Sequence, residues 1–383
     1  MWAGTTVLFG GSALGGRGKP AADVGEDGNV PRSRYWIVTA LLLVIGVSAP
    51  IIAQDKGKTP DKGGDKAADK AKADTPKAAD TPAATGDKVE LKWKFEKDKP
   101  FYQEMTTKTQ QDMKVMGMEV KQTQDQTFYF SWTLKDEDKD KNMVVTQKIE
   151  GVKLTINIAG NPITFDSANP TSANTALAEF FKALVGSEFK LTLDKDTNKV
   201  LKVEGQEEFL KKLTQANQQM EGLLKRILSQ EALKQMADPT FGMTPPNAVA
   251  KGDTWTRETK LNLGPIGSYK GTYKYKYDGQ DDKNKDLAKI SVEATLTYEA
   301  PAEASEATLP FKIKTADLKS KSGKGTIYFD TKKGRLDHSE QTIDLDGKLT
   351  IEIAGMTTDV TLTQTQTTTV ATSDTPQVKK PAS

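Results

Sequence analysis

From Val89 onward, apolar and polar residues alternate along most of the chain, which is typical of half-buried β-strands. Leu91, Trp93 and Phe95, for example, are separated by lysines. Turn-forming sequences separate the alternating segments, among them Asp330–Gly334 and Asp344–Gly347, and predict hairpins. The alternation therefore favours a large antiparallel sheet or two related sheets. The predicted strands span residues 91–95, 127–134, 143–149, 153–158, 255–263, 268–277, 287–298, 325–329, 335–345, 348–353 and 359–370.

The middle of the chain has the spacing of helices, because apolar residues recur there at intervals of three and four. Pro239 and Pro245 predict the end of the last helix. The fold class is thus α+β, a predominantly antiparallel sheet with a helical segment inserted at about residues 174–237. The elements predicted in this segment are helices at Ala176–Val185 and Glu207–Met236 and, between them, a hairpin at Phe189–Val203 that turns at residues 194–198.

Some strand sequences occur twice. Leu154–Gly160 and Leu349–Gly355 differ at one position, and both begin Leu-Thr-Ile. One explanation is an internal duplication whose halves close over a shared concavity. The other is that β-proteins reuse the same strand and turn sequences, and the sequence leaves both open.

An uncharged, mostly apolar run at Trp36–Ala53 follows Arg32 and Arg34, as in a secretory signal or an uncleaved membrane anchor. We therefore expect the protein to work outside the cytoplasm, released or tethered to a membrane through residues 36–53. The predicted organisation is an N-terminal extension at 1–35, the signal or anchor at 36–54, a Lys/Asp/Ala/Pro linker at 55–87, a β-rich domain at 88–372 and a disordered tail at 373–383.

The composition excludes several kinds of chemistry. Cysteine is absent and histidine occurs once, at His338, which excludes thiol catalysis, structural zinc and any site with two imidazoles. The 54 basic and 52 acidic residues give a net charge of +2 with the signs mixed, so we expect no nucleic-acid partner.

Two motifs suggest chemistry that their context does not support. Asp337, His338 and Ser339 are the residue types of a catalytic triad, but consecutive strand residues point to opposite faces. The segment Asp136–Asn142 places oxygen ligands at alternate positions, as a calcium loop does, yet Lys141 stands where the turn needs glycine. The loop at residues 278–286 is a weaker version of the same pattern.

Two further motifs favour structural roles. Tyr273, Tyr275 and Tyr277 alternate with lysines, which predicts a tyrosine ladder facing the core rather than a nucleic-acid surface. The glycine cluster at Gly10–Gly18 lacks the residues of a phosphate loop. The sequence therefore assigns no catalytic, cofactor-binding or metal-ligating residue.

Three segments carry a resemblance: Pro246–Trp255, Phe329–Gly334, and Leu91–Phe95 with Tyr102–Met105. Together they resemble an uncharacterised family of exported bacterial proteins, the domain-of-unknown-function 6263 type, over most of residues 89–371. That family has no known function, so the resemblance implies no site residues.

The order of elements also resembles periplasmic lipoprotein carriers, in which helices close a curved sheet over an apolar cavity. Met113, Met116 and Met118 suit such a cavity, although they suit an ordinary core equally. We expect a non-catalytic envelope protein that binds an apolar ligand or a protein partner. A purely structural envelope domain is the alternative, followed by a hydrolase that uses carboxylates.

Overall fold

The computed structural model describes residues 88–169, 176–216, 218, 221–301, 311–353 and 355–378. The predicted extension, signal or anchor, linker and glycine cluster, and the end of the predicted tail, lie outside these residues. In the part of the chain that the structure describes, no helix is long and apolar enough to cross a lipid bilayer.

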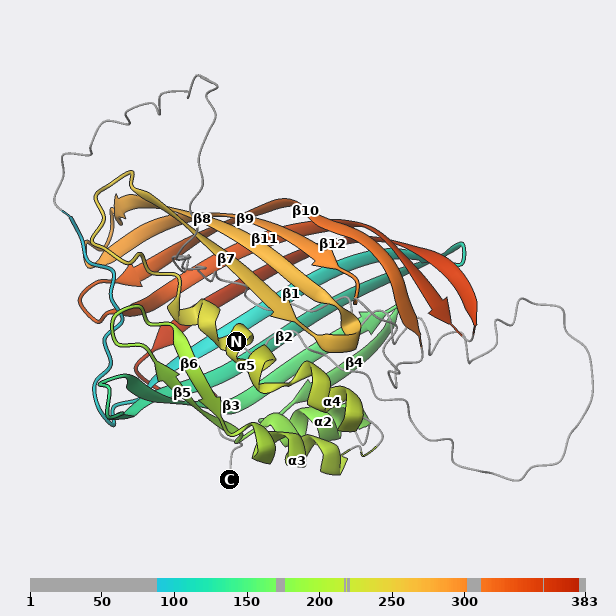
Figure 1. The fold of residues 1–383 in the computed structure, drawn as a ribbon, viewed down its shortest axis with the longest axis horizontal. Coiled ribbons are helices and arrows are strands. Elements are labelled where there is room, and N and C mark those ends of the chain that lie inside the picture. The colour runs from blue at the N-terminus through green and yellow to red at the C-terminus, as the bar shows by residue number, and fades with distance from the viewer. Residues whose placement is uncertain are drawn as a thin grey trace, which may run out of the picture.

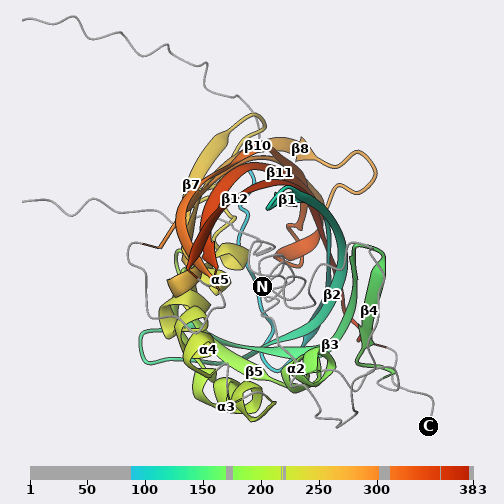
Figure 2. The same ribbon diagram turned by 90° about the vertical axis from the view of Figure 1, so that its right-hand side faces the viewer.

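The strands form one 12-stranded antiparallel sheet in the order β6-β5-β3-β2-β1-β12-β11-β10-β9-β8-β7, with β4 paired to β3 beside this path (Figure 1). This confirms the predicted antiparallel sheet, and β1 pairs with β12 so that both strand regions share it. Seen end-on, the sheet rolls round on itself (Figure 2). The strands are β1 Phe101–Val115, β2 Met118–Glu137, β3 Met143–Ile158, β4 Asn161–Asp166, β5 Glu188–Leu193, β6 Val200–Glu204, β7 Thr254–Asn262, β8 Ser268–Gln280, β9 Leu287–Glu299, β10 Lys312–Asp330, β11 Arg335–Ile353 and β12 Met356–Ser373.

The inserted segment holds short helices, as predicted, but the single helix expected at 207–236 is wrong. Three helices occupy that stretch, and the Ser229 side chain starts the last of them by accepting a hydrogen bond from the Ala232 N–H. This helix continues past Pro239, because a proline in the last turn removes only one hydrogen bond and Gly242 N–H closes the helix on the Asp238 carbonyl. The helices are α2 Ala176–Leu184, α3 Gln206–Ala216, α4 Glu221–Ile227, α5 Gln230–Phe241 and the 3-10 helix η3 Gly264–Ile266.

Helix α5 packs against both edge strands of the rolled sheet, β6 and β7 (Figure 1). On the β6 side, Asp238 Oδ1 accepts from Val200 N at 2.8 Å. On the β7 side, Gln235 Oε1 accepts from Asn262 N at 2.9 Å. An unpaired edge exposes backbone donors and acceptors, and these bonds let one helix satisfy a backbone N–H on each edge.

Two predicted elements are wrong. Residues 91–95 form no strand, although Val89 makes an isolated bridge with Val249. No hairpin forms at Asp344–Gly347, because β11 runs through it with partners on both sides, Gly347 lying opposite Leu318 and Leu362. The hairpin at residues 330–334 is confirmed, and Gly334 supplies the positive φ of 63° that its turn requires.

Aromatic rings fill one end of the rolled sheet, which we call the closed end. Trp93 Nε1 donates to the Phe241 carbonyl at 3.1 Å, and Trp255 Nε1 donates to the Met243 carbonyl at 3.0 Å. These bonds hold the chain after α5 against the sheet. The rings that pack around Phe241 are Trp93, Phe95 and Trp132, with Phe101 and Phe329 beside them.

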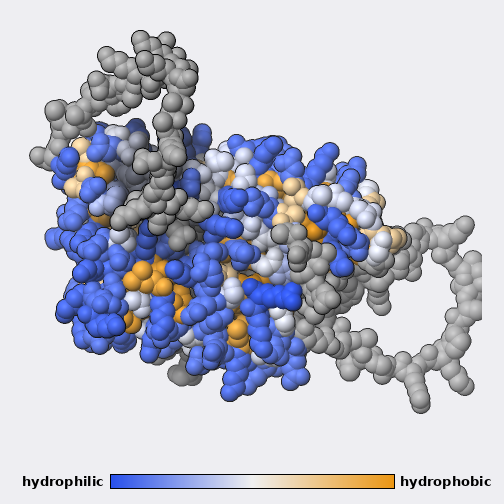
Figure 3. Space-filling view, viewed as in Figure 1, coloured by the Kyte–Doolittle hydropathy of each residue, from blue (hydrophilic) through white to orange (hydrophobic). Residues whose placement is uncertain are grey.

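The outer surface of the sheet and helices is mostly hydrophilic, with apolar residues in small patches on the face shown in Figure 3. Alternate residues of the strands account for this surface. In β8, for example, the tyrosines are buried and the intervening lysines are exposed. The predicted tyrosine ladder at Tyr273–Tyr277 is confirmed, and the rolled sheet keeps its apolar side chains inside.

Candidate ligand-binding site

The inner face of the sheet is uncharged where four strands lie side by side. The register carries the inward positions across β2, β1, β12 and β11, so that Met105 lies opposite Phe128 and Val370, and Val370 lies opposite Ser339. At every inward position of β1 and β12, and of the parts of β2 and β11 paired with them, the residue is apolar, Gln, Thr, Ser or Gly. A ligand in contact with these strands would meet no formal charge.

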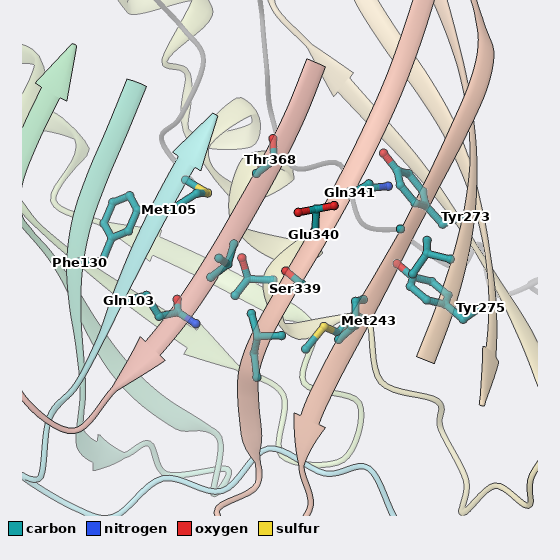
Figure 4. Close-up of a pocket in the computed structure, with 16 residues that line it drawn as sticks. Gln103, Met105, Phe130, Met243, Tyr273, Tyr275, Ser339, Glu340, Gln341 and Thr368 are labelled. Atoms are coloured by element: carbon teal, nitrogen blue, oxygen red, sulfur yellow. The ribbon is translucent and has the colours of Figure 1, made fainter. Parts of the chain in front are cut away.

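A cavity of about 60 Å³ lies between this face and α5, near the closed end (Figure 4). Its apolar wall includes Met105, Phe130, Val292, Ile327 and Leu336, which come from five different strands. The cavity therefore exists only because the sheet rolls and brings β1 and β2 over against β9 and β10.

The cavity wall also contains three buried polar atoms with no hydrogen-bond partner. They are the hydroxyl oxygens of Tyr273 and Tyr275 and the Nε2 atom of Gln341. Burial raises the pKa of both tyrosines well above the usual value of 10.0, so their hydroxyls stay protonated and able to donate. Since a buried polar group without a partner costs stability, these three atoms mark a place where a ligand or water would bind.

A patch of glutamine and threonine continues from the cavity along the inner face. Each of its nine residues is at most 9% exposed, and three of them come from each of β1, β2 and β12. Thr368 belongs both to the patch and to the cavity wall, so the two are continuous. We call this set the Gln/Thr patch: Thr107, Thr109, Gln111, Gln122, Gln124, Gln126, Gln364, Gln366 and Thr368.

The sequence prediction missed the Gln/Thr patch. The available signal was the recurrence of Gln or Thr at every second position, as in Gln122–Gln126 and Gln364–Thr368. The intervening residues are also polar, so the alternation alone does not show which set faces inward.

The structure pairs two residues of the suspected triad, Asp337 and His338, and places the third, Ser339, apart from them in the cavity wall. His338 Nδ1 lies 2.7 Å from Asp337 Oδ2, so our expectation that His338 points away from both neighbours was wrong for Asp337. Both side chains are about half exposed, and the imidazole stacks on Tyr328 on the outer face. Ser339 lines the cavity instead, because it is the next residue along the strand.

The suspected calcium loop is a hairpin tip held by its own side chains. Asp138 accepts hydrogen bonds from the backbone N–H groups of Asp140 and Asn142 and from the Asn142 side chain. These bonds lower the pKa of Asp138 below its usual value of 3.8. In the loop at residues 278–286, Asp281 accepts from two backbone N–H groups in the same manner.

The three methionines near Gly117 lie at the end of the sheet away from the closed end. Met113 is buried on the inner face, and Met116 is 41% exposed in the turn between β1 and β2. Met356, at the start of β12, is 57% exposed at the same end. Flexible apolar side chains thus form part of the rim at this end, which we call the methionine rim.

A sequence profile described as a family of unknown function, DUF6263, matches residues 140–336. The chain belongs to this family. The DUF6263 match runs from the loop before β3 to the start of β11, so it is shorter than the resemblance that we expected over residues 89–371. The matched residues include the helices and the part of the cavity wall that carries Tyr273 and Tyr275. No curated protein matches the sequence.

Among solved structures, lipovitellin is 10% identical, with a TM-score of 0.38 over 76% of this DUF6263 chain, and the chain spans 27% of its length. The Pseudomonas aeruginosa protein OccK5 (OpdH) is 6% identical, with a TM-score of 0.23 over 73% of this chain and 100% of its own. Both likenesses are too remote to carry an argument about function.

Proposed function

We propose that this protein binds an apolar, lipid-like ligand inside the rolled sheet and does so without catalysing a reaction. The observation that carries the proposal is the cavity beside α5, an apolar chamber with three unpartnered polar atoms in its wall. Interiors are close-packed and most of their polar groups are bonded, so the two features together support a bound ligand.

The size of the cavity limits what it holds in this state. A volume of about 60 Å³ accepts one end of a ligand, whereas sites for whole drug-sized molecules have volumes from about 300 Å³ upward. The thioethers of Met105 and Met243 form part of the wall. Because methionine side chains are flexible, we expect the interior to widen when a longer ligand enters.

A non-catalytic role is supported by the chemistry of the cavity wall. Its inward ionisable side chains are the tyrosines, whose raised pKa values keep them neutral. Glu340 also borders the cavity, but it is exposed and lies on the opposite face of β11 from its neighbour Gln341. A hydrolase that uses carboxylates needs two acids facing one cleft, which this wall does not supply.

The place of action in this proposal is outside the cytoplasm. Its support is the apolar run Trp36–Ala53 with Arg32 and Arg34 before it, which lies outside the described residues. A lipid binder there would carry or hold its ligand in the cell envelope, free or tethered to a membrane.

The test is to purify the full chain from the exported fraction without detergent and to identify bound apolar compounds by solvent extraction and mass spectrometry. A stoichiometric lipid-like compound is expected. A matched pair of variants locates it: Val370→Trp fills the cavity wall, and Ala371→Trp places the same ring on the exposed outer face. We expect the first variant to lose the ligand and the second to keep it. A protein that carries no apolar compound, and takes up none when lipids are added, would refute the proposal.

A further inference from the structure

Three glutamines of the Gln/Thr patch stand side by side across neighbouring strands. Gln111 on β1 lies directly opposite Gln122 on β2 and opposite Gln364 on β12. Each is at most 2% exposed, and in each the side-chain oxygen Oε1 has no hydrogen-bond partner. The row therefore presents three buried, unpaired acceptors on one face.

The hydrogen bonds between the glutamines of the patch run along the strands and leave the oxygens of this row unpaired. Gln124 Nε2 donates to Gln126 Oε1 at 2.8 Å, and Gln364 Nε2 donates to Gln366 Oε1 at 3.5 Å. Gln111 Nε2 has only the sulfur of Met113, at 3.3 Å. Because buried amides are normally bonded at both ends, the row is a site that lacks its partner.

Apolar side chains border the patch at both of its ends along the strands. The next inward positions are Met105 and Phe128 toward the cavity, and Met113, Val120 and Leu362 toward the methionine rim. From Thr368 to Gln364 the patch extends about 14 Å along β12 at about 3.4 Å per residue. A matching ligand would have a short polar part attached to apolar groups.

We infer that the ligand is an uncharged amphiphile whose hydroxyl or N–H groups donate hydrogen bonds to Gln111, Gln122 and Gln364. This inference rests on the proposed function and names the ligand class. A hydrocarbon would leave the three oxygens unpaired, and an anionic headgroup would lose its hydration opposite oxygen acceptors. Arg257, an inward cation on β7, already donates to the Thr244 carbonyl at 2.9 Å.

The cavity complements the patch. Its tyrosine hydroxyls and the Gln341 amide are donors, whereas the glutamine row supplies acceptors. The cavity lies about 14 Å from the row along β12, so one short headgroup reaches the row alone and meets it with free hydroxyl groups. A monoacylglycerol is the simplest lipid with these groups, and 1-monooleoylglycerol is therefore the probe.

The experiment compares three ligands with one chain length: 1-monooleoylglycerol, oleate and 1-octadecene. Delipidated full-length protein is incubated with all three, separated from free ligand by gel filtration, and extracted for quantification by mass spectrometry. We expect 1-monooleoylglycerol to be retained at least about tenfold over each of the others, the change expected from two or more hydrogen bonds.

A neighbouring pair of glutamines supplies the matched variants. Gln111 faces inward and Gln110 is exposed on the outer face of the same strand. We expect Gln111→Leu with Gln364→Leu to lower retention of 1-monooleoylglycerol about tenfold without lowering that of 1-octadecene, while Gln110→Leu changes neither. Circular dichroism confirms that the variants fold.

The possible results distinguish a failure of this inference from a failure of the proposed function. Equal retention of the three ligands, or variants that keep full preference for 1-monooleoylglycerol, would overturn the inference and leave the proposed function standing. Preference for oleate would likewise overturn it. Retention of none of the three would count against the proposed function itself.

Discussion

The closed end and the Gln/Thr patch are both buried, and both contain polar side chains, but they treat those side chains differently. At the closed end, three side chains each donate a hydrogen bond to a backbone carbonyl at the end of α5 or just after it. The donors are Trp93, Trp255 and Arg257. In the patch, Gln111 and Gln122 lie opposite each other on paired strands, yet the side-chain oxygen of each has no hydrogen-bond partner. The first region thus bonds most of its buried polar side chains, with Trp132 Nε1 as an exception, and the second leaves a row of glutamine oxygens unbonded.

This difference separates stability from binding. Polar groups that are buried and bonded fix one arrangement of the chain, whereas unbonded ones cost free energy that a ligand can recover. We therefore expect the two regions to respond with opposite sign when their polar residues are replaced by apolar ones. The predictions below test that contrast, from the largest effect to the smallest.

The largest effect is expected from Trp93→Ala at the closed end. The ring is 3% exposed and packs against Phe95, Phe241 and Phe329, so its removal leaves a cavity and an unpaired carbonyl. We expect the free energy of unfolding to fall by about 3–5 kcal/mol, measured by urea denaturation. The exposed neighbour Lys92→Ala is the control, with a change within about 0.5 kcal/mol. A small loss for Trp93→Ala would show that the closed end is not the stable region.

In the patch, Gln111→Leu should raise the stability of the ligand-free protein. The substitution removes an unpaired buried oxygen and keeps an apolar side chain of similar size, so we expect a gain of about 1–2 kcal/mol in the free energy of unfolding. Gln110→Leu on the outer face should change it by less than about 0.5 kcal/mol. A loss of stability at Gln111 would make the patch a structural element and remove the contrast between the two regions.

The sequence predicts the fold best where the two faces of a strand differ. The β8 strand was predicted because Tyr273 and Tyr275 alternate with lysines. The β1 strand and the first part of β2 were not, because residues 106–112 and 121–127 are polar on both faces. Their inward sets are chosen by the pairing of β1 with β12 and of β2 with β1, and not by local alternation.

Turn signals failed where long-range pairing outweighed them. The Asp344–Gly347 sequence is typical of a hairpin, yet Ile343, Leu345 and Leu349 keep the same alternate positions on either side of Gly347. Pairing with β10 and β12 along its whole length keeps β11 extended. The turn propensity of these residues therefore contributes less free energy than the hydrogen bonds that β11 makes with its two neighbouring strands.

The cavity could not be predicted from the sequence, for a related reason. Its members range from Gln103 to Val370 and meet only after the sheet has rolled. The sequence identified Tyr273 and Tyr275 as inward residues, but nothing local indicates that their hydroxyls lack partners. A cavity depends on register across the whole sheet, which alternation within one strand does not specify.

A smaller effect on stability distinguishes the charge of Asp238, near the closed end, from its hydrogen bond. Asp238 is 5% exposed, and burial raises the pKa of its carboxyl above the usual 3.8. A raised folded-state pKa gives stability that is present below pH 3.8 and is lost as the pH rises through the folded value. In Asp238→Asn the amide oxygen still accepts from Val200 N–H and never ionises.

We therefore expect Asp238→Asn to exceed the wild type in stability at neutral pH by on the order of 1 kcal/mol, with the gap closing as the pH falls toward 3.8. Asp238→Ala, which loses the bond to Val200, should instead be less stable than the wild type at all pH values. Thermal unfolding between pH 3 and 8 measures both. If Asp238→Asn behaved like Asp238→Ala, the carboxylate charge and not the hydrogen bond would hold β6.

The smallest effect is expected at Asp374, which lies outside both regions and gives the baseline for a surface pair. Hydrogen bonds from Lys333 and then Arg335 lower the pKa of its carboxyl from 3.8 to about 2. A lowered folded-state pKa gives stability that is present above pH 3.8 and is lost as the pH falls through about 2. Because the Asp374 side chain is 55% exposed, solvent screens the pair, and Asp374→Asn should cost less than about 1 kcal/mol at neutral pH and nothing near pH 2. Urea denaturation at both pH values measures the difference. A cost as large as that of Trp93→Ala would mean that the segment after β12 stabilises the sheet as strongly as the closed end does.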